Sequence, residues 1–241
     1  MNQALNETTD TNWKSLYTLG GVASLILLAY SLATMLILVA IGGQPETAQE
    51  GFTMLQNNRL VGLLRLDVLS IFVMPLYYLL FLDNYAILKK VNNAYAMLAT
   101  VLIFSGLTLF LATPSVFSWL SLSDKFATAT SEAQRVQLLA AADAILASDM
   151  WHGSGAIIGG ILLQTGTVLI SIVMLWGNSF SKATAYVGIL THSLDLAHIF
   201  VGFLFPTLGF IFMAIAGPLY LVWFPLLARD LFRLGRSEIR K

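Results

Sequence analysis

The chain has 241 residues, of which 57% are hydrophobic and 11% are charged. A soluble domain carries roughly 45–50% apolar and about 25% charged residues, so this composition excludes a protein surrounded by water and excludes intrinsic disorder. The 13 basic and 13 acidic residues cancel, which leaves no positive field and excludes nucleic acid as a partner. The lack of cysteine excludes disulfides and thiolate metal sites. We therefore predict an integral membrane protein whose main partner is the lipid bilayer.

Six stretches are long and apolar enough to cross a bilayer, because a spanning helix needs about 20 apolar residues to cover the hydrocarbon. They lie near residues 15–41, 66–88, 94–119, 151–177, 183–205 and 207–229. The sequence therefore predicts an all-α fold. It is a single transmembrane domain over residues 1–241, built as a polytopic bundle of six helices.

Two connections between the predicted spans carry the start signal of a helix. Thr47-Ala-Gln-Glu50 and Ser131-Glu-Ala-Gln134 both have the spacing of a capping box, in which two side chains satisfy the first backbone N–H groups. Apolar residues follow each box at helical spacing. We expect short amphipathic helices at about 47–57 and 131–148 that lie on the outer surface or cap the bundle. A packed lid is the simplest role, and a gate or a partner-binding helix is the alternative.

Basic residues predict the orientation, because lysine and arginine gather on the cytoplasmic side of membrane proteins. Placing the N-terminus inside gives a cytoplasmic set of Lys14, Lys89, Lys90, Lys182, Arg229, Arg233, Arg236, Arg240 and Lys241. The outer set is then smaller: Arg59, Arg65, Lys125 and Arg135. We predict that both termini are cytoplasmic and that the protein resides in the plasma (inner) membrane.

Three segments carry a family resemblance. They are Ser121-Leu-Ser-Asp-Lys-Phe-Ala-Thr-Ala-Thr-Ser-Glu-Ala-Gln-Arg135, Leu138-Leu-Ala-Ala-Ala-Asp-Ala-Ile-Leu146 and Ser181-Lys-Ala-Thr-Ala-Tyr-Val-Gly-Ile-Leu190. They resemble a family of bacterial multipass membrane proteins, domain of unknown function 4386, and the resemblance covers most of the chain. It implies a bacterial origin and a six-helix fold, and it brings no catalytic motif.

The fifth predicted span contains an unusual polar stripe. An ionisable residue inside a span costs a few kcal/mol and needs a partner or a purpose. Thr191, His192, Asp195 and His198 share one helix face at 100° per residue. Asp195 lies about 18 Å from the inner end of this span at ~1.5 Å per residue, close to the bilayer midplane. We expect the stripe to face the bundle interior, with Gln164 of the fourth span at matching depth.

Prolines and outer polar residues complete the candidate region. Gly217-Pro218 is expected to interrupt the sixth span, and Pro75 the second, because proline removes a helical hydrogen bond. Asp67, Asp149 and His152 are predicted at the outer ends of spans. The depths of these residues allow a cavity that opens outward and ends at Asp195.

The sequence leaves three functions open. The first is non-enzymatic binding or translocation of a small solute or proton, with His192, Asp195, His198, Thr191 and Gln164 as the candidate ligand- or proton-binding residues. Histidine suits this role because its pKa lies near working pH, and transporters place such sites beside broken helices. The second is a structural or accessory membrane subunit, in which the stripe only holds helices together.

The third function is a zinc-dependent intramembrane hydrolase that acts on lipid. Zinc would be the cofactor, and its weak candidate ligands are His152, His198, Asp67 and Asp149, with one position left for water. The histidines of the stripe, His192 and His198, are six residues apart. Two histidines four residues apart on a helix would reach one metal ion better. We therefore favour binding or translocation without a cofactor. The sequence leaves the oligomeric state and any partner subunit open.

Overall fold

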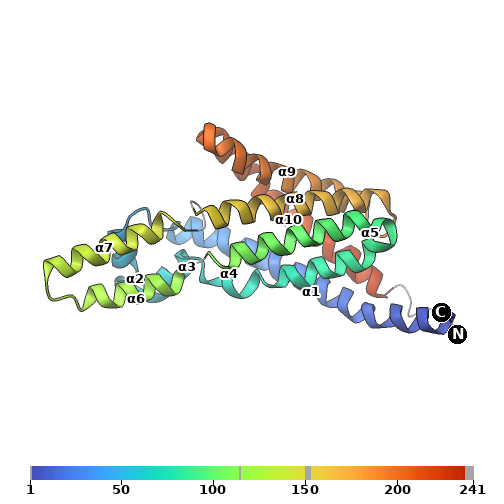
Figure 1. The fold of residues 1–241 in the computed structure, drawn as a ribbon, viewed down its shortest axis with the longest axis horizontal. Coiled ribbons are helices and arrows are strands. Elements are labelled where there is room, and N and C mark those ends of the chain that lie inside the picture. Colours follow the sequence, from blue (N-terminus) through green and yellow to red (C-terminus); the bar gives the residue numbers. More distant parts are fainter. Residues whose placement is uncertain (1, 114, 150–152, 237–241) are drawn as a thin grey trace.

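The computed structural model describes residues 2–113, 115–149 and 153–236, with side chains from residue 13 onward, and every regular element in this part is an α-helix (Figure 1). The all-α prediction is confirmed. The helical elements are α1 Asn2–Ile41, α2 Ala48–Asn57, α3 Arg59–Arg65, α4 Val68–Val73, α5 Leu76–Leu111, α6 Val116–Ala127, α7 Glu132–Leu146, α8 Ser154–Trp176, α9 Lys182–Leu204 and α10 Pro206–Arg236.

Within the described residues, five helical segments are long and apolar enough to cross a membrane. They are Trp13–Ile41, Val68–Ala127, Ser154–Trp176, Lys182–Leu204 and Pro206–Arg236. The segment Val68–Ala127 has 60 residues, about twice the length that one crossing requires. These segments confirm that the chain is compatible with a multipass membrane bundle.

The long helix α5 folds back on itself at Asn92. The hydroxyl of Tyr78 lies 2.6 Å from Oγ1 of Thr108, although 30 residues of straight helix would separate them by about 45 Å. Asn92 has φ −152° and ψ 99°, and its side chain accepts a hydrogen bond of 3.2 Å from the N–H of Tyr95. Asn92 thus acts as an N-cap. It divides α5 into a first arm (76–91) and a second arm (93–111) that run antiparallel (Figure 1).

The predicted break at Pro75 and the predicted end of the third span have different outcomes. Met74 and Pro75 separate α4 from α5, as proline predicts. The third predicted span was wrong at its outer end, because α5 stops at Leu111 and Val116 opens another helix. The sequence has a proline at 114, which disfavours helix in the residue before it.

The interruption predicted at Gly217-Pro218 was also wrong. The helix α10 continues through Pro218 and Pro225. The φ angle of proline fits a helix, and the backbone group that it frees can be satisfied locally or by a neighbouring helix in a membrane bundle.

Close contacts between helix backbones fix the arrangement of the bundle. A Cβ atom on Gly106 of the second arm would lie 2.5 Å from the carbonyl oxygen of Gly159 in α8, so these two helices touch backbone to backbone. The helix α1 packs antiparallel to α10, where Ser24 donates a hydrogen bond of 2.9 Å to the carbonyl of Phe224. The start of α1 and the end of α10 therefore lie at the same end of the bundle (Figure 1), here called the terminal end.

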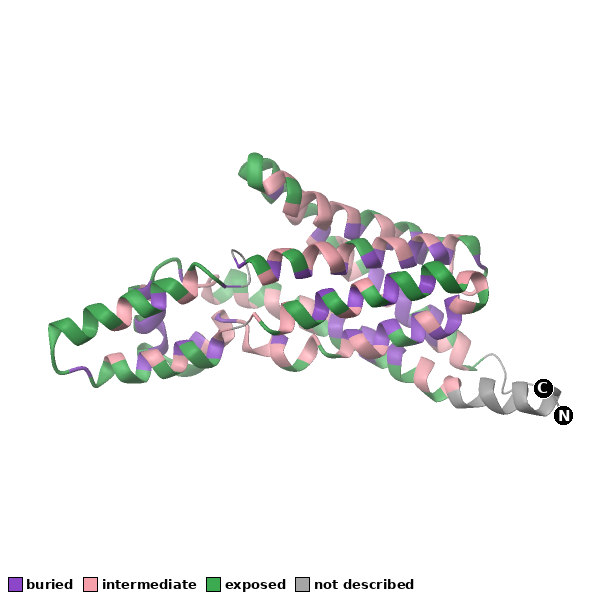
Figure 2. Ribbon diagram, viewed as in Figure 1, coloured by how far each residue is buried: buried purple, intermediate pink, exposed green. Residues whose placement is uncertain are grey.

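The opposite end, the cap end, carries α2, α3, α6 and α7, which extend beyond the bundle (Figures 1 and 2). Both capping boxes are confirmed: Thr47 Oγ1 accepts from the N–H of Glu50 at 3.1 Å, and Ser131 Oγ from that of Gln134 at 3.2 Å. The cap has its own hydrophobic core, formed by Ala48, Phe52, Met54, Leu55, Leu66, Val116, Trp119 and Ala142. The expected helices at 47–57 and 131–148 are thus α2 and α7. In α7, Ala142 is buried and most other residues are exposed or partly exposed.

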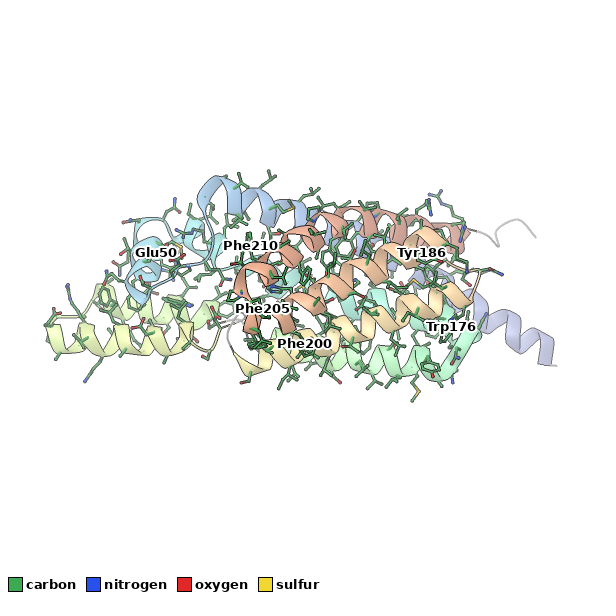
Figure 3. The ribbon with its side chains drawn as sticks, turned by 90° about the horizontal axis from the view of Figure 1, so that it is seen from above. Glu50, Trp176, Tyr186, Phe200, Phe205 and Phe210 are labelled. Atoms are coloured by element: carbon green, nitrogen blue, oxygen red, sulfur yellow. The ribbon has the colours of Figure 1, made fainter. Side chains whose placement is uncertain are left out.

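The outer halves of α9 and α10 form a hairpin that leans away from the bundle (Figure 1). A Cβ atom on Gly209 of α10 would lie 2.6 Å from Cα of Gly202 in α9, so the two helices are tightly paired with each other. Phe200, Phe205 and Phe210 point outward from this hairpin (Figure 3) and are 54%, 61% and 62% exposed. Such an apolar surface is suited to lipid.

Candidate functional site

Side chains from three helices form one hydrogen-bonded network inside the bundle. Gln164 of α8 donates to Asp195 Oδ2 of α9 at 3.1 Å, and its own carbonyl oxygen lies 2.6 Å from Nδ1 of His192. Tyr220 of α10 donates its hydroxyl hydrogen to the same Asp195 oxygen at 2.5 Å. The four residues are here called the Asp195 network.

Helix periodicity explains the part of this network that lies on one helix. His192 and Asp195 are three residues apart, which places both side chains on the same face of α9. Gln164 can bridge them because its amide group has both a donor and an acceptor. Its NH₂ group donates to Asp195, so its oxygen accepts from His192. Nδ1 of His192 therefore carries a hydrogen, and a neutral ring leaves Nε2 as an acceptor.

Three polar atoms next to the network are buried and have no hydrogen-bond partner among the described residues. They are Nε2 of His192, Oγ of Ser171 in α8 and Nε1 of Trp223 in α10. A Cβ atom on Gly188 would lie 2.6 Å from Ser171 Oγ and 2.7 Å from Trp223 Nε1, so Gly188 allows these two groups to approach. The rings of His192 and Trp223 meet edge to face with centroids 4.7 Å apart. The site therefore holds one acceptor, one donor and one hydroxyl that can be either.

The donors to Asp195 are neutral groups, the amide of Gln164 and the hydroxyl of Tyr220. Such donors stabilise a carboxylate without neutralising its charge. Aromatic rings lie next to this carboxyl group: Tyr220 itself, and Phe224, which stacks on Tyr220 with ring centroids 5.7 Å apart. A carboxyl group held in this way can gain or lose a proton without breaking an ion pair.

An anchor at the terminal end sets the register of α9 against α10. Asp230 of α10 is fully buried, and its Oδ2 accepts from the N–H of Ser181 at 2.8 Å and from Thr184 Oγ1 at 2.6 Å. Thr184 and Asp195 are about 16 Å apart along α9, and Asp230 and Tyr220 about 15 Å apart along α10, at ~1.5 Å per residue. The matching lengths bring Tyr220 to the level of Asp195.

The structure brings some predicted site residues together and separates others. Gln164, His192 and Asp195 meet as described. Thr191 is buried, but its hydroxyl donates to the carbonyl of Val187 in its own helix at 2.7 Å. His198 lies farther out on the hairpin, with Nδ1 3.0 Å from the carbonyl oxygen of Gly209.

The sequence analysis missed Tyr220. A tyrosine in an apolar span is itself a signal, because a phenol group buried in hydrocarbon needs a hydrogen-bond partner. That signal does not name the partner. Trp223, Ser171 and the anchor residue Asp230 were missed for the same reason.

The zinc hypothesis stays a prediction. His152 lies outside the described residues, and Asp67 accepts a hydrogen bond of 2.7 Å from Tyr30. Asp149 lines a small pocket at the cap end, whereas His198 lies on the α9–α10 hairpin. Among the described residues, no three His, Cys, Asp or Glu side chains form a group that could hold a metal ion. Elemental analysis of protein that has never met a chelator, beside His198→Ala, tests the hypothesis directly.

No protein-family model, curated protein or solved structure matches the chain. The function must therefore be argued from the chemistry of the Asp195 network, because a helical bundle alone is compatible with many activities.

Proposed function

We propose that this protein is a six-span integral membrane protein that binds or translocates a proton or a small solute at the Asp195 network. The observation that carries the proposal is the group of unpartnered buried atoms beside the network, above all Nε2 of His192. A buried polar atom without a partner costs about 1–3 kcal/mol. A site that keeps several such atoms next to a carboxyl group is suited to a ligand that supplies the missing hydrogen bonds.

The six-span topology is supported by the two arms of α5. Counting each arm as one crossing, α1, the two arms, α8, α9 and α10 give an even number of crossings. An even number agrees with the common position of both chain ends at the terminal end. Lys89, Arg229 and Arg233 lie near this end, and by the positive-inside rule this supports a cytoplasmic location for it. We keep the plasma (inner) membrane as the proposed location.

Asp195 supplies the chemistry of proton binding. Its carboxylate takes up one proton and becomes a neutral carboxyl group, and the hydrogen bonds from Gln164 and Tyr220 make the reverse step accessible. His192 can hold the donor group of a small solute through Nε2, while Trp223 and Ser171 face the acceptor groups of the same solute. The hairpin formed by α9 and α10 is the element that could move, because its outer half leans away from the rest of the bundle (Figure 1).

Proton flux into liposomes tests the proposal. Purified protein is reconstituted with a pH-sensitive dye inside the vesicles, and a potassium gradient with valinomycin sets an inside-negative potential. We expect flux above that of empty liposomes in the unaltered protein. In Asp195→Asn the flux should fall to the empty-liposome level. Asp124→Asn on the exposed cap surface is the matched control and should keep full flux.

Two outcomes contradict the proposal. If the unaltered protein neither moves protons nor gains thermal stability from any small solute in an Asp195-dependent way, binding and translocation at this site are both wrong. If Asp195→Asn keeps full flux and only lowers the unfolding temperature, the network serves packing, as the structural hypothesis holds.

A further inference from the structure

A second buried polar pair lies in the first arm of α5, apart from the Asp195 network. Asp83 and Asn84 are both 0% exposed. All four polar atoms of their side chains are buried and make no hydrogen bond of normal geometry among the described residues, although the backbone of Gly20 in α1 lies close to the Asp83 carboxyl group. An unpaired carboxylate in the hydrocarbon region is costly, so such residues are rare and mark functional positions.

Asp83 is fitted closely against α1. A Cβ atom on Gly20 of α1 would overlap Oδ2 of Asp83, so the carboxyl group occupies the space that a larger residue at position 20 would take. Its neighbours in α5 include Leu80, Phe81 and Leu88, each fully buried in the hydrophobic core. The carboxyl group therefore lies between an apolar core and the bare backbone of α1.

The charged groups at this end of the bundle are engaged elsewhere or lie nearer the surface. Lys89 lies with Nζ 4.9 Å from the ring centre of Trp13. Asp230 of α10 is held by Ser181 and Thr184, and Arg233 donates to the carbonyl of Ser179. The other basic residues at this end are Lys14 of α1, Lys90 of α5, Lys182 of α9 and Arg229 and Arg236 of α10. Arg229 donates to the hydroxyl of Ser181 at 2.9 Å, and Lys182 donates to the carbonyl of Gly177 at 3.2 Å. Between Leu80 and Leu88, Asp83 is the one carboxyl group, and there is no lysine, arginine or histidine.

The chemistry of this pocket favours a proton over a metal cation. A calcium ion takes about six to eight oxygen ligands, whereas the side chains of this pair offer only the oxygens of Asp83 and Asn84. A proton needs a single oxygen and removes the charge that the apolar surroundings oppose.

We propose that Asp83 is a second proton-binding carboxyl group, which exchanges its proton with the terminal end of the bundle and holds it as a neutral acid. In this step the Asp83 carboxylate takes up one proton from the aqueous side and becomes a neutral carboxyl group, and release of the proton restores the carboxylate. Asp83 lies about 14 Å along the helix from the turn at Asn92, and Asp195 about 20 Å from the start of α9, at ~1.5 Å per residue. As a relay for Asp195 this inference rests on the proposed function, whereas proton binding by Asp83 does not.

Infrared spectroscopy across a pH titration tests the inference, because a protonated carboxyl group in an apolar site gives a carbonyl band separate from that of carboxylates. We expect such a band in the unaltered protein at a pH at which exposed carboxyl groups are ionised. It should lose intensity in Asp83→Asn and shift in Asp83→Glu. Asp124→Asn, on the exposed cap, should leave the band unchanged. If Asp83→Asn does not fold, Asp83→Glu alone still tests the inference through the shift.

Flux measurements separate this inference from the proposed function. A band that depends on Asp83, together with full flux in Asp195→Asn, would support the Asp83 site and contradict the proposed function. Flux that depends on Asp195, together with a band unchanged in Asp83→Asn and Asp83→Glu, would overturn the Asp83 site alone. If both hold, Asp83→Asn should slow the flux at least tenfold, as expected for a lost relay.

Discussion

Tyr220 donates a hydrogen bond of 2.5 Å to Asp195, which is 25 positions earlier in the sequence, and the tip of the α9–α10 hairpin lies between them. This bond joins the two helices halfway along their length. It connects the outer hairpin, which we propose can move, to the carboxyl group that would carry the proton.

Replacing Tyr220 by phenylalanine should remove the donor and keep the ring. We expect Tyr220→Phe to lower the free energy of unfolding by ~0.6–2 kcal/mol, the range for a polar contact between membrane helices, and to slow proton flux because the Asp195 carboxylate loses a donor. Thermal unfolding in detergent and the liposome assay measure the two effects. Tyr186→Phe, on a ring that is 63% exposed, is the control and should change neither.

The contact between the second arm of α5 and α8 should not tolerate one extra methyl group. In Gly106→Ala the new Cβ would lie 2.5 Å from two backbone atoms, the oxygen of Gly159 and the nitrogen of Leu163. Forcing the helices apart should cost about 1–3 kcal/mol. Gly217→Ala makes the same chemical change where nothing lies within 4 Å. It should be neutral or stabilise by about 0.5–1 kcal/mol, and equal losses in both variants would contradict the proposed backbone contact.

The cap should loosen in acid through Glu50. The backbone N–H of Glu46 and the guanidinium group of Arg65 bind the Glu50 carboxylate at 2.9 and 2.8 Å, and they hold its pKa below the ordinary value. Because the pKa is lower in the folded state, the stabilisation is complete above the unfolded-state pKa and is lost as the pH falls through the folded-state pKa.

Hydrogen exchange over residues 46–57, corrected for the intrinsic rate at each pH, measures this effect. Exchange should rise in acid in the unaltered protein. In Glu50→Gln it should already be raised at neutral pH and should respond less to acid. Glu132→Gln, which removes a charge from the first turn of α7, should behave like the unaltered protein, and an identical response in both variants would speak against the Glu50 contact.

The anchor at the terminal end should contribute more than a surface ion pair. Asp230→Ala removes the acceptor for the Ser181 N–H and the Thr184 hydroxyl, and leaving such buried groups unpaired costs about 1–3 kcal/mol each. Asp124→Ala breaks an ion pair with Arg59 whose side chains are both 60% exposed, which should cost about 0–1 kcal/mol. Chemical unfolding of both variants gives the comparison. Proteolysis should also cut the loop between α8 and α9 faster in Asp230→Ala.

Several elements could be predicted because their signals are local. Apolar length along the chain was sufficient for α1, α8 and α9, and the capping boxes at Thr47 and Ser131 placed the starts of α2 and α7. The continuity of α10 through Pro218 could not be predicted, because neighbouring groups decide whether a membrane helix tolerates a proline.

The candidate site was predictable only in part. Helix periodicity puts His192 and Asp195 on one face, and the cost of burying them indicates that this face turns inward. Nothing in one sequence states that Gln164 reaches both, or that Tyr220 arrives from the next helix. The same holds for Asp83, whose place beside Gly20 depends on a helix more than 60 residues earlier in the chain.

The sequence by itself predicted a membrane environment, the helical class and the polar stripe on the fifth predicted span. Composition and a period of 3.6 residues act within single segments, so these features can be predicted without knowing the tertiary structure. Only the tertiary structure decided which polar groups meet. The rotation and register of one helix against another depend on close contacts such as Gly106 with Gly159 and Asp230 with Thr184. These contacts join residues far apart in the chain, so their effect on Asp195 and Tyr220 emerges only when the bundle is assembled.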